Sequence, residues 1–183
     1  MRNVITAFVA TGALLGGTVS AWAANPATAT FTVSATVLKT CSVTATNLGF
    51  GSYTPGVAAL TATSTVTVSC SNGTTYTVAL DKGTTAGGTV AQRLMLETGG
   101  TSTLQYSLCT SPAVAGVCPA NTAWGDGNNG TVTQGGTGAG MAAVNAKAFT
   151  VNGGLPDNAF NQAAQVNGVS TAYSDLVTVS VAY

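Results

Sequence analysis

The feature that most constrains this chain is an unbroken alternation of apolar and hydroxyl side chains near its N-terminus. From Ala27 to Val37 every odd-numbered residue is Ala, Phe or Val, and every even-numbered residue is Thr or Ser. Successive side chains of a strand point to opposite faces, so this period of two predicts a β-strand with one apolar face. Because the segment precedes the first cysteine, Cys41, such a strand can stand apart from the main domain and be lent to a neighbouring molecule.

A simpler interpretation of the same segment is that it forms the first strand of its own domain. Periodicity alone favours this alternative, because most strands pair within their own chain. The two interpretations differ in where the apolar face is buried, and the pattern itself does not choose between them.

The first 23 residues have the features of a secretory signal peptide. Arg2 supplies a positive charge, Val4 to Leu15 is mostly apolar, and Ala21-Trp22-Ala23 is a small-x-small cleavage site. A membrane anchor is the alternative, but threonine and glycine interrupt the apolar run, which falls short of the ~20 apolar residues of a spanning helix. We therefore expect an exported chain that begins at Ala24 and forms one domain.

Charged residues are rare, with five basic and five acidic residues among 183 and no histidine. The basic residues are scattered, so the sequence predicts no nucleic-acid partner. The missing histidine removes the commonest general base, and the acidic residues fall in predicted turns and strand ends; Asp175, for example, is expected to be a structural turn residue. We expect no enzymatic activity, no metal and no cofactor.

The four cysteines of an exported chain indicate two disulfides. Four cysteines allow three connectivities, and the sequence leaves all of them open. We favour Cys41 with Cys70, which would tie the start of the domain to the end of a strand, and Cys109 with Cys118, which would close a loop containing Pro and Gly. A zinc site is disfavoured, since the spacings are not paired CxxC and there is no histidine.

Strand patterns recur along the rest of the chain, and helix patterns do not. Ser71-Asn72-Gly73 predicts that the first two strands form a hairpin, and glycine-rich connections are expected at 83–88, 125–140 and 152–154. Many short strands without an amphipathic helix predict an all-β sandwich of immunoglobulin-like type, with a closed barrel as the alternative. The predicted strands are Leu60 to Cys70, Tyr76 to Leu80, Arg93 to Glu97, Thr103 to Cys109, Val144 to Val151 and Ser174 to Tyr183.

The last predicted strand carries apolar residues on one face that nothing in the pattern covers. An exposed apolar edge of this kind is an aggregation liability unless another strand pairs with it. The residues that share this face are Val177, Val179, Val181 and Tyr183.

A set of short motifs occurs in a defined order along the chain. In order, they are Cys41, Phe50-Gly51-Ser52-Tyr53, Cys70, Tyr76-Thr77-Val78-Ala79-Leu80-Asp81, Leu104-Gln105-Tyr106-Ser107-Leu108, Trp124-Gly125, Pro156, Gly168 and Tyr173-Ser174-Asp175. Together these motifs resemble the spore coat protein U domain, a family that includes the subunits of archaic, Csu-type chaperone-usher pili. The resemblance covers Thr28 to Tyr183.

The resemblance implies an incomplete immunoglobulin-like β-sandwich that is completed by donor-strand exchange. It divides the chain into a signal peptide (1–23), an N-terminal donor-strand extension (24–39) and a spore coat protein U or pilin domain (40–183). The Val177 to Tyr183 strand would flank the acceptor groove. The donor residues that would enter a neighbour's groove are Ala29, Phe31, Val33, Ala35 and Val37.

The same resemblance implies partners and a location. A periplasmic chaperone would hold the subunit, an outer-membrane usher would assemble it, and copies of this chain or related subunits would form a pilus (fimbria) on the cell surface for attachment and biofilm formation. One alternative is a secreted spore or cell coat protein built by the same exchange. Another is a monomeric secreted carbohydrate-binding sandwich whose sugar site is lined by Tyr53, Tyr76, Tyr106, Trp124 and Tyr173.

Overall fold

The computed structural model describes residues 26–164 and 171–183, so the expected signal peptide lies outside the described residues. The chain divides into two units, Met1–Thr36 and Val37–Tyr183, which are treated separately below. In the first unit, residues 26–36 are exposed and adopt no regular secondary structure.

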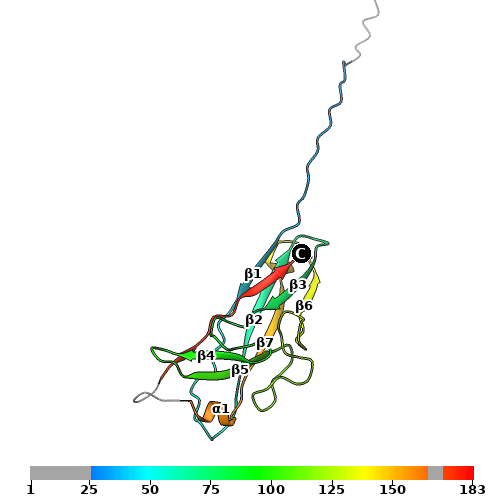
Figure 1. Cartoon of the computed structure of the whole chain (residues 1–183). Coiled ribbons are helices and arrows are strands. Elements are labelled where there is room, and N and C mark those ends of the chain that lie inside the picture. The colour runs from blue at the N-terminus through cyan, green and yellow to red at the C-terminus, as the bar shows by residue number, and fades with distance from the viewer. Residues whose placement is uncertain (1–25, 165–170) are drawn as a thin grey trace, which may run out of the picture. The chain divides into compact units, whose positions relative to one another are not determined.

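The second unit consists of two antiparallel sheets (Figure 1). The larger sheet has the order β1-β2-β7-β5-β4-β8, with β1 at Cys41–Ala45, β2 at Leu60–Cys70, β7 at Lys147–Leu155, β5 at Thr103–Cys109, β4 at Arg93–Glu97 and β8 at Tyr173–Ser174. The smaller sheet has the order β6-β3-β9, with β6 at Gln134–Thr137, β3 at Thr75–Leu80 and β9 at Val179–Ala182. A short helix α1, Ala159–Gln162, and a 3-10 turn, Ala143–Asn145, complete the described elements. The expected all-β sandwich is confirmed.

The hydrophobic core lies between the apolar faces of the two sheets. Every second residue at the end of β2 and along β3 is buried, as the period of two predicts. Trp124 is fully buried, and its Nε1–H donates to the carbonyl of Val78 at 3.1 Å, so its only polar group is satisfied. The core cluster includes Val66, Val68, Cys70, Tyr76, Val78, Leu80, Tyr106, Leu108, Trp124, Phe149 and Val151.

The predicted hairpin between β2 and β3 is wrong. Strand β2 pairs with β1 and β7, whereas β3 pairs with β6 and β9. The turn at residues 71–73 therefore carries the chain from one sheet to the other, and the Gly73 N–H donates to the carbonyl of Gly138 at 2.9 Å. The apolar faces of β2 and β3 meet across the core because the chain crosses over at this turn.

Two further differences involve glycines within strands. Residues 152–154, expected as a loop, belong to β7, and a Cβ at Gly153 would lie only 2.8 Å from the side chain of Leu48. Strand β6 lies inside the expected loop 125–140, where a Cβ at Gly135 would lie 2.6 Å from the carbonyl oxygen of Tyr76. Both glycines make room for close packing, a role that is indistinguishable from loop glycine in the sequence.

Other strand boundaries also differ from expectation. Strands β2, β4 and β5 have the predicted bounds, but β1 was not predicted, and β7 begins at Lys147 after a 3-10 turn. The final predicted strand divides into β8 and β9. Within residues 26–164 and 171–183, no helix has the length and apolar character needed to cross a membrane.

Candidate functional site: the open edges of β1 and β9

Strand β1 is one of the two edge strands of the larger sheet, strand β9 is one of the two edge strands of the smaller sheet, and they lie beside each other. Strand β1 pairs with β2, strand β9 pairs with β3, and within the second unit neither has another strand partner among the described residues. Figure 1 shows β1 next to the red strand β9 that leads to the C-terminus. We call their unpaired sides the open edges.

The register of β9 determines which of its backbone groups are unpaired. The Asp81 N–H donates to the carbonyl of Thr178 at 3.1 Å, and Leu80 lies opposite Val179 in the continuing ladder. Hydrogen-bonded and non-hydrogen-bonded pairs alternate in an antiparallel ladder, so every second residue of β9 turns its N–H and C=O away from β3. The residues that do so are Val179 and Val181 within β9 and, in the same alternation, Val177 just before it.

The same three valines also contribute to the core. Their side chains are half-buried and pack against the core cluster, whereas the residues between them are exposed. Tyr183, expected as a fourth member of this face, is 57% exposed and lies outside the core cluster. The open edge of β9 therefore combines free backbone groups with incompletely covered valine side chains.

Strand β1 has the matching arrangement. The hydrogen bond from Ser71 N–H to the Thr40 carbonyl, 2.9 Å, sets a ladder in which Cys41, Val43 and Ala45 turn their backbone groups away from β2. Val43 lies directly opposite Val68, so the two side chains share the core-facing side of the sheet. Val68 is 1% exposed, but Val43 is 36% exposed. The difference shows that the core is uncovered along the open edge of β1.

The uncovered apolar surface continues beyond the ends of these strands. Leu48, Phe50 and Met95 are half-buried and pack against the core cluster. A cavity of about 580 Å³ lies between the loop at 48–55 and the residues just before β8, with Met95, Leu104 and Leu155 among its lining residues. Incompletely covered core residues are therefore not confined to β1 and β9.

The predicted donor segment shows an apolar face without cover. Phe31, Val33 and Val37 are 87%, 82% and 88% exposed, and Ala29 and Ala35 are also exposed. Residues 26–40 contain no strand. Exposed apolar side chains at regular spacing are typical of a surface that another molecule covers.

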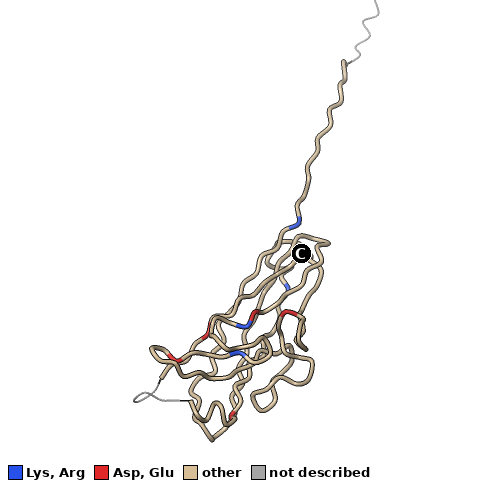
Figure 2. Tube along the Cα trace, in the orientation of Figure 1, with Lys and Arg blue, Asp and Glu red and all other residues tan. Residues whose placement is uncertain are grey.

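A group of buried and half-buried polar residues, not recognised from the sequence, lies where the chain enters β9. The guanidinium of Arg93 is buried, and its Nε and Nη2 donate to the carbonyls of Asp81 and Trp124 at 2.8 and 2.9 Å. Burial lowers the pKa of Arg93 because it disfavours the charged form. Figure 2 shows that charged residues are sparse along the described trace.

Two carboxylates of this group hold the residues before β9, and we call Asp81 and Asp175 the carboxylate clamp. Asp175 Oδ2 accepts from the Tyr106 hydroxyl at 2.6 Å, and Asp81 Oδ1 accepts from the Thr178 N–H at 2.9 Å. Burial and the bond to Asp175 together raise the pKa of Tyr106, so this phenol remains a donor. The expected role of Asp175 as a structural turn residue agrees with these contacts.

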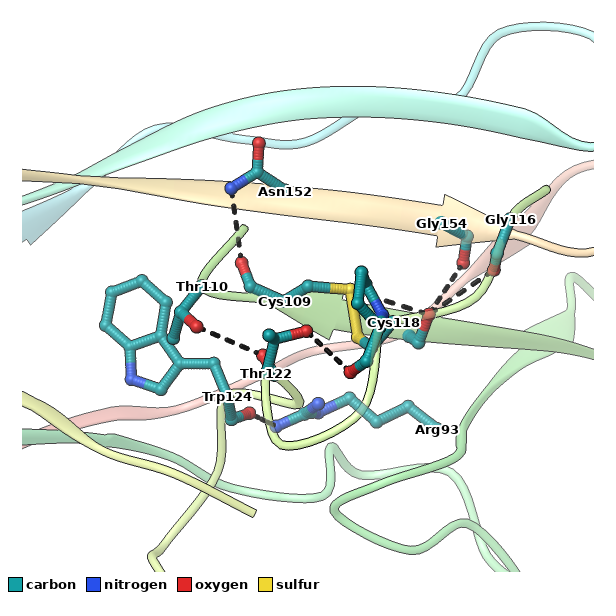
Figure 3. The surroundings of a disulfide bond; sticks show 11 residues. Arg93, Cys109, Thr110, Gly116, Cys118, Thr122, Trp124, Asn152 and Gly154 are labelled. Carbon is teal, nitrogen blue, oxygen red and sulfur yellow. Dashed lines mark hydrogen bonds between the residues drawn. A yellow bond between two sulfur atoms is a disulfide. The ribbon is translucent and has the colours of Figure 1, made fainter. Parts of the chain in front are cut away.

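The disulfides pair Cys41 with Cys70 and Cys109 with Cys118, the connectivity favoured above. The first bond fastens the start of β1 to the end of β2, next to the open edge. The second closes a loop beside β5 and β7 (Figure 3), where the Asn152 side chain donates to the carbonyl of Cys109 at 3.4 Å.

The aromatic residues considered for a sugar site are mostly core residues. Tyr76, Tyr106 and Trp124 are 4%, 5% and 0% exposed. Only Tyr53 and Tyr173 of the five are partly accessible. The alternative of an aromatic sugar platform is therefore not supported by this set of residues.

Comparison with known proteins identifies the family of this chain. One solved structure that it resembles is the pre-assembly complex of CsuC and CsuE, a chaperone and a tip adhesion subunit, from the archaic chaperone-usher Csu pili of Acinetobacter baumannii. The sequence identity is 23% and the TM-score is 0.53, and the match covers 81% of this chain and 41% of the other. This chain therefore shares the fold of the chain it matches and spans less than half of its length. No curated protein matches. The model of the Spore Coat Protein U domain matches residues 27–180, and the chain therefore belongs to the spore coat protein U domain family.

Proposed function

We propose that this chain is a structural subunit of a chaperone-usher pilus and polymerises by donor-strand complementation. In this proposal, residues 27–37 of one copy add as a strand to the open edges of β1 and β9 in the next copy. The observation that carries it is the coexistence of an uncovered strand-like apolar face and an uncovered core edge in one chain. Family membership and the fold shared with a pilus subunit complex support the same function.

The chemistry of the two surfaces is complementary. An added strand would supply N–H and C=O groups to the free backbone groups of the open edges, and its apolar side chains would cover residues such as Val43 and Val179. Burial of Phe31, Val33 and Val37 at roughly 1.5 to 3 kcal/mol each gives on the order of 5 to 9 kcal/mol. Ordering the segment opposes this at about 1 to 2 kcal/mol per residue, so backbone pairing and closure of the core are also required.

Domain boundaries and partners follow from this mechanism. Residues 24–39 would be the extension, residues 40–183 the acceptor domain, and residues 1–23 the export signal. A periplasmic chaperone would cover the open edges before assembly, and an outer-membrane usher would exchange it for the next subunit at the cell surface. The subunit would be non-enzymatic, with a role in surface attachment and biofilm formation.

The geometry of the exchange favours a fibre. The donor and acceptor surfaces are different parts of the chain, so each contact is head-to-tail and leaves one of each surface free at the ends. Such a contact extends indefinitely unless the rotation closes a ring. A coat layer built by the same exchange would require additional lateral contacts.

A charge on the apolar face of the extension tests the function. Phe31→Asp should abolish SDS-resistant ladders on gels and fibres in electron micrographs, because a carboxylate would have to enter an apolar groove. Thr32→Asp is the matched control, since it places the same charge on the opposite face of the segment and should leave the ladders intact. Normal fibres from Phe31→Asp would refute the proposal.

A further inference from the structure

We propose that Asp175, together with Asp81, is a positioning residue that holds β9 ready for a donor strand before the donor arrives. This inference rests on the proposed function, and it gives the carboxylate clamp a role in donor binding.

Strand β9 needs such support because its own pairing is slight. It comprises four residues, Val179–Ala182, and pairs on one side only with β3. Its core-facing valines are only half-buried. Edge segments with few buried contacts open more readily than the rest of a domain, so an unsupported β9 would fray in the donor-free subunit.

Asp175 provides five hydrogen bonds just before this strand. Its Oδ1 accepts from the N–H groups of Thr84 and Thr85, each at 3.0 Å, and from both hydroxyl groups at 3.2 and 3.0 Å. Its Oδ2 accepts from the Tyr106 hydroxyl at 2.6 Å. Hydrogen bonds to a carboxylate are about twice as strong as those between neutral groups, so one side chain fixes this point of the backbone firmly.

Asp81 fixes a second point three residues further on. Its Oδ1 accepts from the Thr178 N–H at 2.9 Å, and its own N–H donates to the Thr178 carbonyl at 3.1 Å. The backbone is thereby held on both sides of Val177, the first valine of the open edge.

The clamp also joins the two sheets. Tyr106 and Arg93 belong to the larger sheet, whereas Asp81 and Thr178 follow and precede strands of the smaller one. Because β1 is an edge of the larger sheet, a clamp between the sheets limits how far the open edge of β9 can move relative to that of β1.

The backbone at Gly83 leaves room for the Asp175 carboxylate. A Cβ at Gly83 would lie 1.8 Å from Asp175 Oδ2, and Gly83 has a φ of +82°. Only glycine combines this backbone conformation with the space for the carboxylate. The loop after β3 therefore packs closely against Asp175.

A preformed edge should act mainly on the rate of donor binding. A donor that meets an ordered β9 does not have to order it, and preorganisation of this kind reduces the entropic cost of association. Once the donor is in place, β9 has a second strand neighbour and depends less on the clamp. Loss of the clamp should therefore slow association more than it speeds dissociation.

The experiment uses the mature chain with Phe31→Asp, whose own extension is inactive, and a synthetic peptide with the sequence of residues 24–39. In this background, Asp175→Ala should slow peptide association about tenfold and change dissociation by less than about twofold. Asp175→Asn keeps one acceptor oxygen and should restore part of the association rate. Asp126→Ala is the matched control, because Asp126 accepts similar bonds from Asn128 and Thr131 in the loop after Trp124 rather than from the residues around β9, so the association rate should stay close to that of the background.

The outcomes separate the two proposals. If the peptide does not bind the Phe31→Asp background at all, the proposed function fails. If it binds and the Asp175 variants associate at the same rate as the control, the positioning role is overturned. Should Asp175→Ala fail to fold, hydrogen exchange of residues 176–182 in Asp175→Asn decides, since the proposal requires faster exchange there and unchanged exchange contradicts it.

Discussion

Two segments of this chain have almost the same sequence pattern and opposite environments. Residues 27–37 and strand β2, Leu60–Cys70, both alternate mostly apolar residues with Thr and Ser. In β2 the apolar positions Val66 and Val68 are 1% exposed, whereas Phe31 and Val33 of the first segment are 87% and 82% exposed. An alternating pattern therefore specifies a strand with an apolar face, but it does not specify which molecule covers that face.

The difference lies in the neighbours that each segment finds within the described structure. Strand β2 has β1 on one side and β7 on the other, and its apolar face packs against β3 and Trp124 in the core. The open edges of β1 and β9 lack a neighbour of this kind. Within the described residues, one strand pattern therefore has no strand partner, and the adjacent edge strands β1 and β9 are each open on one side.

Introducing a carboxylate into each segment should produce the largest difference between them in the free energy of unfolding. Val68→Asp places a carboxylate in the core, where an unpaired charge costs several kcal/mol, so this variant should not fold stably. Phe31→Asp should change the free energy of unfolding of the monomer by less than about 0.5 kcal/mol, because the side chain is exposed there. Denaturant unfolding followed by Trp124 fluorescence measures both.

The buried indole makes this a sensitive probe, since Trp124 is fully buried and the other tryptophan, Trp22, lies in the expected signal peptide. Equal stability of Val68→Asp and Phe31→Asp would show that the two segments have equivalent environments, against the structure.

Much of the fold could be predicted because period-two patterns report directly on burial. Strands β2, β4 and β5 have the predicted bounds, and the alternation in β2 and β3 identified the core residues correctly. The hairpin was mispredicted because Ser71-Asn72-Gly73 suits a tight turn, whereas sheet membership depends on distant partners such as β7 and β9. Local turn chemistry does not distinguish a hairpin from a crossover between sheets.

The candidate site was predictable only in part. Val177, Val179 and Val181 were recognised from alternation, but Val43 was not, since its role depends on pairing with Val68. The clamp was missed for a similar reason: Asp81 and Asp175 are 94 positions apart, and nothing in the local sequence of Arg93 predicts a fully buried guanidinium. Contacts between distant residues require the three-dimensional structure.

Removing the disulfide at the start of β1 measures how much stability depends on the link between the first and second strands, just after the uncovered segment. Cys41 begins β1 and is bonded to Cys70, which ends β2, across a separation of 29 residues. Replacing both with serine should lower the free energy of unfolding by about 3.5 kcal/mol in the chain-entropy model. Replacing Cys109 and Cys118, which are 9 residues apart, should cost about 2.7 kcal/mol by the same model, because the closed loop is shorter. Denaturant titrations that reverse this order would indicate that strain or local packing outweighs loop closure.

Lowering the pH should have the smallest effect on the free energy of unfolding. The residues before β9 can respond to it through ionisation, and residues 26–38 cannot. Residues 26–38 contain no ionisable side chain, whereas the approach to β9 depends on Asp81. Burial disfavours the ionised form of Asp81, but hydrogen bonds from Thr178 and Gly83 and the charge of Arg93 outweigh it and lower the pKa of this carboxyl. A lowered folded-state pKa stabilises the domain above the unfolded value of about 3.9, and this contribution is lost as the pH falls through the lower folded value.

The free energy of unfolding of the monomer should therefore fall as the pH drops below about 4. Asp81→Asn should remove part of that dependence, and the exposed Asp126→Asn should remove less, because solvent screens its interactions. Denaturant unfolding at pH 7, 4 and 3 measures the slopes. If Asp81→Asn follows the wild-type profile, ionisation of this carboxylate does not stabilise the backbone before β9. The difference between residues 26–38 and the paired strands would then rest on strand pairing and apolar burial alone.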